Sequence, residues 1–143
     1  MRISQRARYA VKASLDLALH ATPKRGARSA EVAARTGVPE KFLEAILRDL
    51  RDAGVVISKR GPDGGHRLAA DPSRFTVGEV VEAIDGPLSN AKSTQRGQVR
   101  PEEACIRSLW EQVETAVRDI LRGVSLDDLR REAGAPEAVD FNI

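Results

Sequence analysis

The chain has 143 residues, of which 41% are hydrophobic and only 3% aromatic, so we expect one small domain, alone or with a dimerisation arm, and an aliphatic core. No apolar run approaches the roughly 18 residues that span a bilayer, and no apolar segment of a secretory signal follows the charged N-terminus. The single cysteine excludes an intramolecular disulfide framework and suits a reducing compartment. We therefore expect a cytoplasmic protein without a membrane partner.

The net charge of +2 conceals an asymmetry between the two halves of the chain. Residues 1–75 carry 15 Lys/Arg and 8 Asp/Glu, a net of +7, whereas residues 76–143 carry 8 and 13, a net of −5. A basic first half indicates an anionic partner, nucleic acid before membrane. Basic surfaces are common, however, so the order of the structural elements has to decide.

Three helices are predicted in the first half. Residues 4–21 have apolar side chains at helical spacing, with Ser4 as the expected N-cap. Ser29 is expected to cap a short helix over 30–36, and Gly37 follows where a left-handed helix end favours glycine. Pro39 is expected in the first turn of a helix that runs to about residue 53. The stripe expected to be buried on that helix comprises Phe42, Leu43, Ile46, Leu47 and Leu50.

Two short β-prone runs come next, at 55–58 and 66–69, and the glycine-rich segment 59–65 joins them as a predicted hairpin. Thr76 and Glu79 form a capping box that opens a helix to about residue 85. Residues 86–101 lack apolar periodicity and predict a loop, a long helix follows from about 102 to 123, and Ser125 caps a last short helix. The predicted fold is mainly α with a small β-hairpin: a winged helix-turn-helix over 1–85, a loop over 86–101, and a long C-terminal dimerisation helix, short helix and loose tail over 102–143.

This order of elements is typical of a DNA-binding winged helix-turn-helix. A tight turn holds two helices so that the second presents its exposed face to the major groove. The hairpin tip, poor in side chains, can reach the minor groove, where a narrow groove favours an inserted arginine. Arg60, at the base of the wing, is the first candidate, and Glu44 can accept a hydrogen bond from cytosine N4. The predicted DNA-binding set is Arg6, Ser29, Lys41, Phe42, Glu44, Arg48, Arg51, Arg60, Gly61, Gly64, Gly65 and His66.

Members of this set also have ordinary structural interpretations. The cations Lys41, Arg48 and Arg51 fit a solvated helix surface, and Glu44 fits an ion pair with Arg48 at i,i+4. Gly64 and Gly65 fit simple hairpin geometry, and His66 fits a half-buried strand position as well as a phosphate contact. The set is more specific than its members, because the turn, the wing and the positive charge all fall in one half of the chain.

Several motifs resemble the IscR/CymR-like winged-helix regulators, over nearly the whole chain. They are Arg8-Tyr9-Ala10-Val11, Leu43-Glu44, Arg60-Gly61-Pro62-x-Gly64-Gly65, Val77-Gly78-Glu79-Val80, Leu109-Trp110 and Ser125-Leu126-x-x-Leu129. The resemblance implies a homodimer on a dyad-symmetric operator of double-stranded DNA. It also implies DNA contacts at Lys41, Phe42 and Glu44, entry of Arg60 into the minor groove, and phosphate neutralisation by Arg6.

The long helix supports the dimer independently. Its apolar residues are spaced 4-3-4-3-4, and one small domain cannot cover them all on a protruding helix. Packing of part of this stripe against the protomer's own core is the alternative. The predicted dimerisation residues are Ile106, Trp110, Val113, Val117, Ile120 and Val124.

The best-known members of that family hold a [2Fe–2S] cluster through three cysteines and a nearby histidine, and this sequence departs from their pattern. The loop over 86–101 has no cysteine, the third cysteine's place falls on Ala104, and the histidine's place falls on Arg107. The ligand set is therefore incomplete, because such a cluster requires thiolates. Cys105 remains as a buried small apolar residue, a redox-sensing thiol, or one ligand of an unusual cluster completed by other groups or another subunit.

The sequence thus predicts a DNA-binding transcription regulator, acting as a homodimeric repressor whose effector it does not identify. One alternative is a thiol- or [2Fe–2S]-dependent sensor of redox state or iron on the same fold, and another is a winged-helix protein-interaction module. We do not expect an enzyme, because no nucleophile–base spacing is present and His20 and His66 lie on separate elements.

Overall fold

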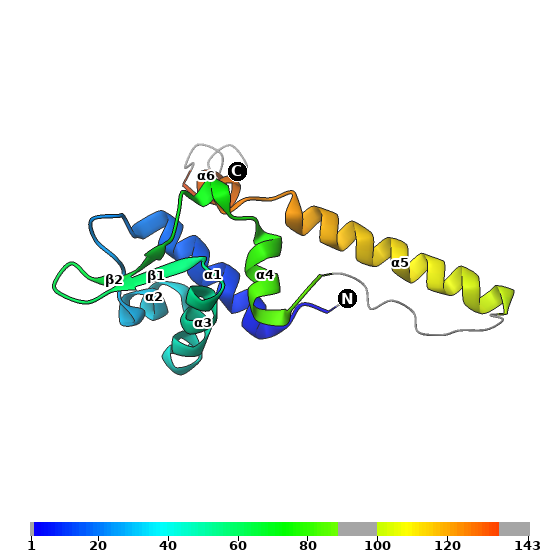
Figure 1. Cartoon of the computed structure of the whole chain (residues 1–143), viewed down its shortest axis with the longest axis horizontal. Coiled ribbons are helices and arrows are strands. Elements are labelled where there is room, and N and C mark those ends of the chain that lie inside the picture. Colours follow the sequence, from blue (N-terminus) through cyan, green and yellow to red (C-terminus); the bar gives the residue numbers. More distant parts are fainter. Residues whose placement is uncertain (1, 89–99, 135–143) are drawn as a thin grey trace, which may run out of the picture.

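A computed structural model describes residues 2–88 and 100–134 of the chain and shows a mainly helical protein with one hairpin (Figure 1). The elements are α1 (Gln5–His20), α2 (Ser29–Thr36), α3 (Glu40–Asp52), β1 (Val56–Lys59), β2 (Gly65–Leu68), a 3₁₀ turn η1 (Pro72–Arg74), α4 (Val77–Asp85), α5 (Pro101–Arg122) and α6 (Leu126–Ala133). Helix α5 extends away from the other elements, and the hairpin lies at the opposite end of the molecule. The predicted fold class is confirmed. The predicted tail over 135–143 and most of the predicted loop lie outside the described residues.

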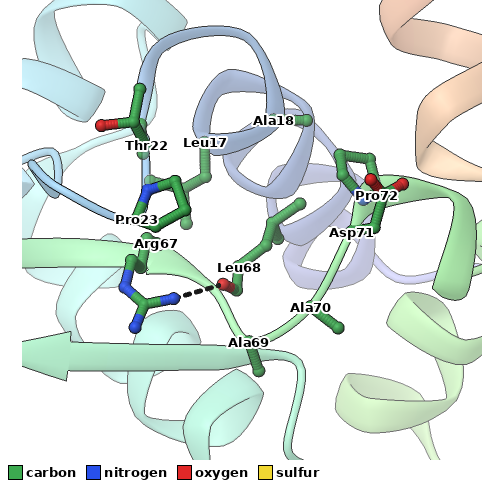
Figure 2. Close-up of a pocket in the computed structure, with 11 residues that line it drawn as sticks. Leu17, Ala18, Thr22, Pro23, Arg67, Leu68, Ala69, Ala70, Asp71 and Pro72 are labelled. Atoms are coloured by element: carbon green, nitrogen blue, oxygen red, sulfur yellow. Dashed lines mark hydrogen bonds between the residues drawn. The ribbon is translucent and has the colours of Figure 1, made fainter.

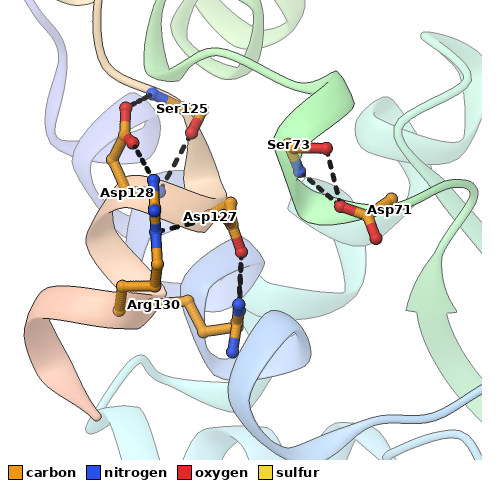
Figure 3. A network of polar contacts seen from close by, with 7 residues as sticks. Asp71, Ser73, Ser125, Asp127, Asp128 and Arg130 are labelled. Carbon is orange, nitrogen blue, oxygen red and sulfur yellow. Dashed lines mark hydrogen bonds and ion pairs between the residues drawn. The ribbon is translucent and has the colours of Figure 1, made fainter. Parts of the chain in front are cut away.

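Local hydrogen bonds explain where several helices begin and end. The Ser4 hydroxyl accepts a hydrogen bond from the Ala7 amide at 3.0 Å, as expected of an N-cap. Gly37 ends α2 with a φ of 77°, a left-handed conformation that other residues rarely adopt. Capping boxes open α4 and α6, and Figure 3 shows the second, in which Ser125 and Asp128 exchange hydrogen bonds of 2.9 Å.

Two predicted helix starts are wrong by one residue. Ser29 is the first residue of α2 and not its N-cap, which is Arg28, whose amide donates to the Glu31 carboxylate at 3.0 Å. The Ser29 hydroxyl lies instead 3.1 Å from the His66 ring. Pro39 is the N-cap of α3 and not a residue of its first turn. The long helix α5 begins at Pro101, close to the predicted start near residue 102, because the fixed φ of proline suits a first turn.

The main core forms where α1 packs against α2, α3 and α4, with Leu17, Leu43, Ile46 and Leu47 at most 1% exposed. Four members of the predicted stripe of α3 are buried, but Phe42 is 44% exposed and its assignment to the core is wrong. Phe42 lies in the first turn of α3, at the edge of the stripe, where the described elements leave it only partly covered.

An ion pair fixes α2 against α1. Asp16 is only 6% exposed, and Arg35 donates two hydrogen bonds of 2.9 Å to its two carboxylate oxygens. His20 Nε2 lies 3.9 Å from the same carboxylate. This bidentate geometry restrains both helices more strongly than a single contact does. The pair therefore helps to set the angle of the helix-turn-helix.

The root of α5 is joined to the rest of the protein by backbone as well as side chains. The Val77 amide donates to the Val124 carbonyl at 2.8 Å, and the Leu126 amide donates to the Phe75 carbonyl at 2.9 Å. A Cβ added to Gly78 would lie only 3.0 Å from the Arg122 side chain, so α4 passes close to the end of α5. These bonds flank the start of α4 and form a joint, made of residues 75–78 and 122–126, between the long helix and the winged domain.

Candidate nucleic-acid interface

Helix α3 presents a row of charged residues to solvent. Lys41, Glu44, Arg48 and Arg51 are all exposed, and their spacing of three or four residues places them on one face of the helix. The Lys41 ammonium lies 5.0 Å from the centre of the exposed Phe42 ring. The opposite face of α3 is buried in the core, so this row faces outward as a recognition helix requires.

The wing is a two-stranded antiparallel hairpin in which Ser58 pairs with His66 and Lys59 with Gly65. A Cβ at Gly64 would lie 2.2 Å from the Lys59 carbonyl oxygen, and Gly65 has a φ of 124°. Hairpin geometry therefore accounts for both glycines, and their contact with DNA stays a prediction. Arg60 is exposed at the start of the tip and has no hydrogen bond or ion pair within residues 2–88 and 100–134.

A hollow of about 460 Å³ lies between the wing and the N-terminus of α2, and we call it the wing hollow. Its lining contains four cations, two serines and the half-buried His66: Arg28, Arg51, Lys59 and Arg60, with Ser29 and Ser58. The Arg28 guanidinium donates to the Gly61 carbonyl at 2.7 Å and so ties the wing tip to α2. Six of the lining residues belong to the predicted DNA-binding set: Ser29, Arg51, Arg60, Gly61, Gly65 and His66.

His66 occupies the floor of the wing hollow. Its Nδ1 lies 2.6 Å from the Ser58 hydroxyl and its Nε2 3.1 Å from the Ser29 hydroxyl. Burial lowers the pKa of His66, and the nearby Arg51 charge lowers it further, while Glu44 acts in the opposite direction. The ring is therefore neutral near pH 7.

Arg6 is separate from this cluster. Its guanidinium donates to the Asp49 carboxylate on α3 at 2.8 Å, an exposed pair. An exposed ion pair of this kind is weak, so it does not prevent Arg6 from turning to a phosphate. Its predicted role stays a prediction.

A second hollow, of about 370 Å³, lies on the other side of β2 (Figure 2). Leu17, Pro23 and Leu68 contribute apolar surface, and Arg67 donates a long hydrogen bond of 3.4 Å to the Leu68 carbonyl. Because neighbouring strand residues point to opposite faces, His66 lines the wing hollow and Arg67 lines this one.

Helix α5 has no buried residue and carries much of the exposed apolar surface. Ile106, Leu109, Trp110, Val113 and Ile120 are between 44% and 66% exposed, and Val117 is partly exposed. Leu121 and Val124 instead pack against a small cluster around Val81, which is the alternative foreseen for part of the stripe. Among the described residues, no other element therefore covers this apolar face along most of its length.

The comparisons with known proteins agree with this architecture. The sequence model of the Rrf2 family, described as an iron-dependent transcriptional regulator, matches residues 3–132. This chain belongs to the Rrf2 family. The transcriptional regulator IscR of Vibrio campbellii is 33% identical over 141 residues, covering 98% of this chain and 83% of that protein.

Two solved Rrf2 structures are similar over most of their length. CymR, the global cysteine regulator of B. subtilis, has a TM-score of 0.78 and 29% identity, covering 92% of this chain and 98% of that one. IscR of T. potens has a TM-score of 0.78 and 28% identity, covering 93% and 88%. Membership of the Rrf2 family confirms the predicted winged-helix fold and the predicted class, a DNA-binding transcription regulator.

The residues of this Rrf2 protein do not fit a three-cysteine [2Fe–2S] site. Cys105 is the only cysteine of the chain, and its exposed thiol donates to the Glu102 carbonyl at 3.2 Å. Within the described residues, no three His, Cys, Asp or Glu side chains lie close enough together to hold a metal ion. The interpretation of Cys105 as a buried apolar residue is wrong for the protomer, because its side chain is exposed and no element of the described residues packs on the first turns of α5.

Sequence reasoning missed three residues of the wing hollow: Arg28, Ser58 and Lys59. The hairpin register gives a signal for Ser58, since it places this residue opposite His66. Arg28 comes from another element and gave no such signal. Among the described helices, none has the length and apolar character needed to cross a membrane.

Proposed function

We propose that this protein is a homodimeric, sequence-specific repressor that binds a dyad-symmetric operator in double-stranded DNA. One observation carries the proposal: three groups of side chains lie on adjoining elements. They are the exposed row of α3, the unpaired Arg60 of the wing and the cations of the wing hollow. Base edges are read by a helix in the major groove, while phosphate contacts fix its register.

Each part of this surface has a separate task. Arg48 and Arg51 extend along the exposed face of α3 to donate to base edges or phosphates, and the Glu44 carboxylate can accept from cytosine N4. The exposed Phe42 ring offers apolar surface of the kind that contacts a thymine methyl group. Arg60 reaches the minor groove from the wing, where the negative potential of a narrow groove holds a guanidinium.

A second copy of the chain is the proposed cover for α5. Five large apolar side chains on one helix are 44–66% exposed, so covering them completely would contribute roughly half of the 1.5–3 kcal/mol that full burial of each provides, which favours association. Pairing of two α5 helices places the two winged domains in a symmetric arrangement, and half-sites about one helical turn apart, or a multiple of it, would match them.

Selection of bound sites from random duplexes, followed by fluorescence anisotropy across a salt series, tests the proposal. We expect a dyad-symmetric consensus and an affinity that falls with salt at a slope of about −0.9 per neutralised phosphate. Arg60→Ala should lose roughly tenfold or more in specific affinity, whereas the matched control Arg74→Ala, exposed on η1, should bind as wild type.

The same measurements separate the alternatives. A protein-interaction module would bind every duplex weakly, with little response to salt. Equal and small effects of Arg60→Ala and Arg74→Ala would contradict the assignment of the wing to DNA.

A further inference from the structure

A chain of hydrogen bonds crosses the floor of the wing hollow and joins four elements. Arg51 Nη1 on α3 donates to the Ser58 hydroxyl on β1 at 3.2 Å. That hydroxyl lies 2.6 Å from His66 Nδ1 on β2, and His66 Nε2 lies 3.1 Å from the Ser29 hydroxyl on α2. Ser29 is thus the last member of the chain, in the first turn of α2.

The chain has one consistent direction. The Ser58 oxygen already accepts from Arg51, so its single hydrogen is available for His66 Nδ1. A neutral imidazole that accepts at Nδ1 carries its proton on Nε2 and donates it to the Ser29 oxygen. The opposite tautomer would aim two donors at the Ser58 oxygen and leave the Ser58 hydrogen without an acceptor among the described residues. The hydrogen of the Ser29 hydroxyl then has no acceptor within this series of hydrogen bonds, and it can be donated to a bound ligand.

The surroundings of Ser29 favour an anion. Four cations line the same hollow: Arg28, Arg51, Lys59 and Arg60. The one carboxylate whose charge acts on His66 is that of Glu44 on α3, so positive charge predominates. The other nearby carboxylate, Glu31, is already engaged: its hydrogen bond from the Arg28 amide lowers its pKa most, and nearby arginines add to this. The amides of the first turn of α2 add partial positive charge.

We propose that the wing hollow is the seat of one backbone phosphate of the bound DNA, and that His66 is a positioning residue that turns the Ser29 hydroxyl toward it. Hydrogen bonds aligned in one direction polarise one another, so the Arg51 charge strengthens the last donor as well. This inference rests on the proposed DNA-binding function. It adds two points to that function: the hollow holds a phosphate group, and His66 has to be neutral for the phosphate to be held.

The test pairs protein variants with operator duplexes in which the same phosphate of both half-sites is replaced by an uncharged methylphosphonate, one symmetric pair of positions at a time. In the wild type, one such pair should cost about tenfold in affinity for each half-site, the effect of losing one hydrogen bond to a charged group. Ser29→Ala, which changes both protomers, should also lose about tenfold for each half-site with the unmodified duplex. With that pair of phosphates replaced, Ser29→Ala should lose no more than about twofold further, because the charge that strengthens its hydrogen bond is already gone.

His66→Phe keeps the ring shape and removes both hydrogen bonds. It should reproduce the Ser29→Ala loss, and the double variant should lose no more than Ser29→Ala alone. Ser29→Thr retains the hydroxyl and should stay within about twofold of wild type, while thermal unfolding of every variant monitors the fold. Neither Ser29→Ala nor His66→Phe should alter the salt slope, whereas Arg60→Ala should make it less steep by about 0.9 for each protomer, or about 1.8 for the dimer.

Additive losses in the double variant, or equal losses of Ser29→Ala at every methylphosphonate position, would overturn the phosphate seat while leaving DNA binding intact. Failure of the wild type to bind any selected duplex would instead refute the proposed function itself. The two failures are therefore distinguishable.

Discussion

The ion pair between Asp16 and Arg35 permits a quantitative prediction about stability. Arg35→Ala removes both hydrogen bonds to a carboxylate that is only 6% exposed and leaves His20 as its remaining neighbour at 3.9 Å. Breaking a fully buried pair costs about 3–5 kcal/mol. The Arg35 side chain is 32% exposed, so water reaches the site, and we reduce the expected loss to about 2–3 kcal/mol.

Urea unfolding followed by circular dichroism measures this loss. With a typical slope of about 1–3 kcal/mol per molar, the midpoint should fall by roughly 0.7–3 M. The protomer concentration has to be the same for all variants, because dimerisation stabilises the folded state by mass action. The matched control is Arg131→Ala, whose side chain is 65% exposed, so its pairs with the partly buried Asp127 and the exposed Asp128 should contribute less than about 1 kcal/mol.

A double variant completes the test. Asp16→Leu combined with Arg35→Met removes both charges and should recover most of the lost stability, because no unpaired buried charge remains. The reasoning is refuted if Arg35→Ala costs no more than Arg131→Ala, or if the double variant is as unstable as the sum of the two single changes.

Three further predictions concern the dimer, the cysteine and pH. Ile120→Asp should shift the protein from dimer to monomer at micromolar concentration in sedimentation equilibrium, while Gln112→Asp on the same helix should not. Equal behaviour of the two variants would argue against pairing through the apolar face. Anaerobically purified protein should be colourless and free of iron and still bind its operator, as should Cys105→Ser; a visible cluster spectrum would disprove our reading of the ligand set. Because the folded pKa of His66 lies below its unfolded value of about 6.5, the unfolded chain binds more protons, so the unfolding free energy should fall as pH drops from about 6.5 through the folded pKa. Urea midpoints at pH 7.5 and 5.5 should show a smaller fall in His66→Gln than in wild type, and identical falls would contradict this origin.

Features that depend on neighbours in sequence were predictable. The caps at Ser4, Thr76 and Ser125 and the turn at Gly37 each involve residues within four positions, so the local pattern contains the whole reason for the structure. The apolar period predicted α5 in the same way. It also predicted that most of its stripe would be left uncovered in one protomer.

Features that depend on residues far apart in the sequence were not predictable. Ser29 looks like an N-cap by type, but its hydroxyl lies against His66, which is 37 positions away. Phe42 has the spacing of a core residue, yet which elements cover the first turn of α3 is decided by tertiary packing. Asp16 did leave a signal, an acid between Leu15 and Leu17, but nothing local identifies Arg35 as its partner.

Because α5 is attached to the winged domain mainly at one end, a small change of angle at this joint produces a large displacement at its other end. Its 22 residues correspond to a length of about 33 Å, so a tilt of 10° at residues 75–78 and 122–126 would move its far end by about 6 Å. In a pair of protomers joined along this arm, the same tilt would carry each winged domain several ångströms away from its half-site. For the proposed dimer, occupancy of the operator would therefore depend on the angle of a few backbone hydrogen bonds, far from any base, as well as on the side chains of the winged domain.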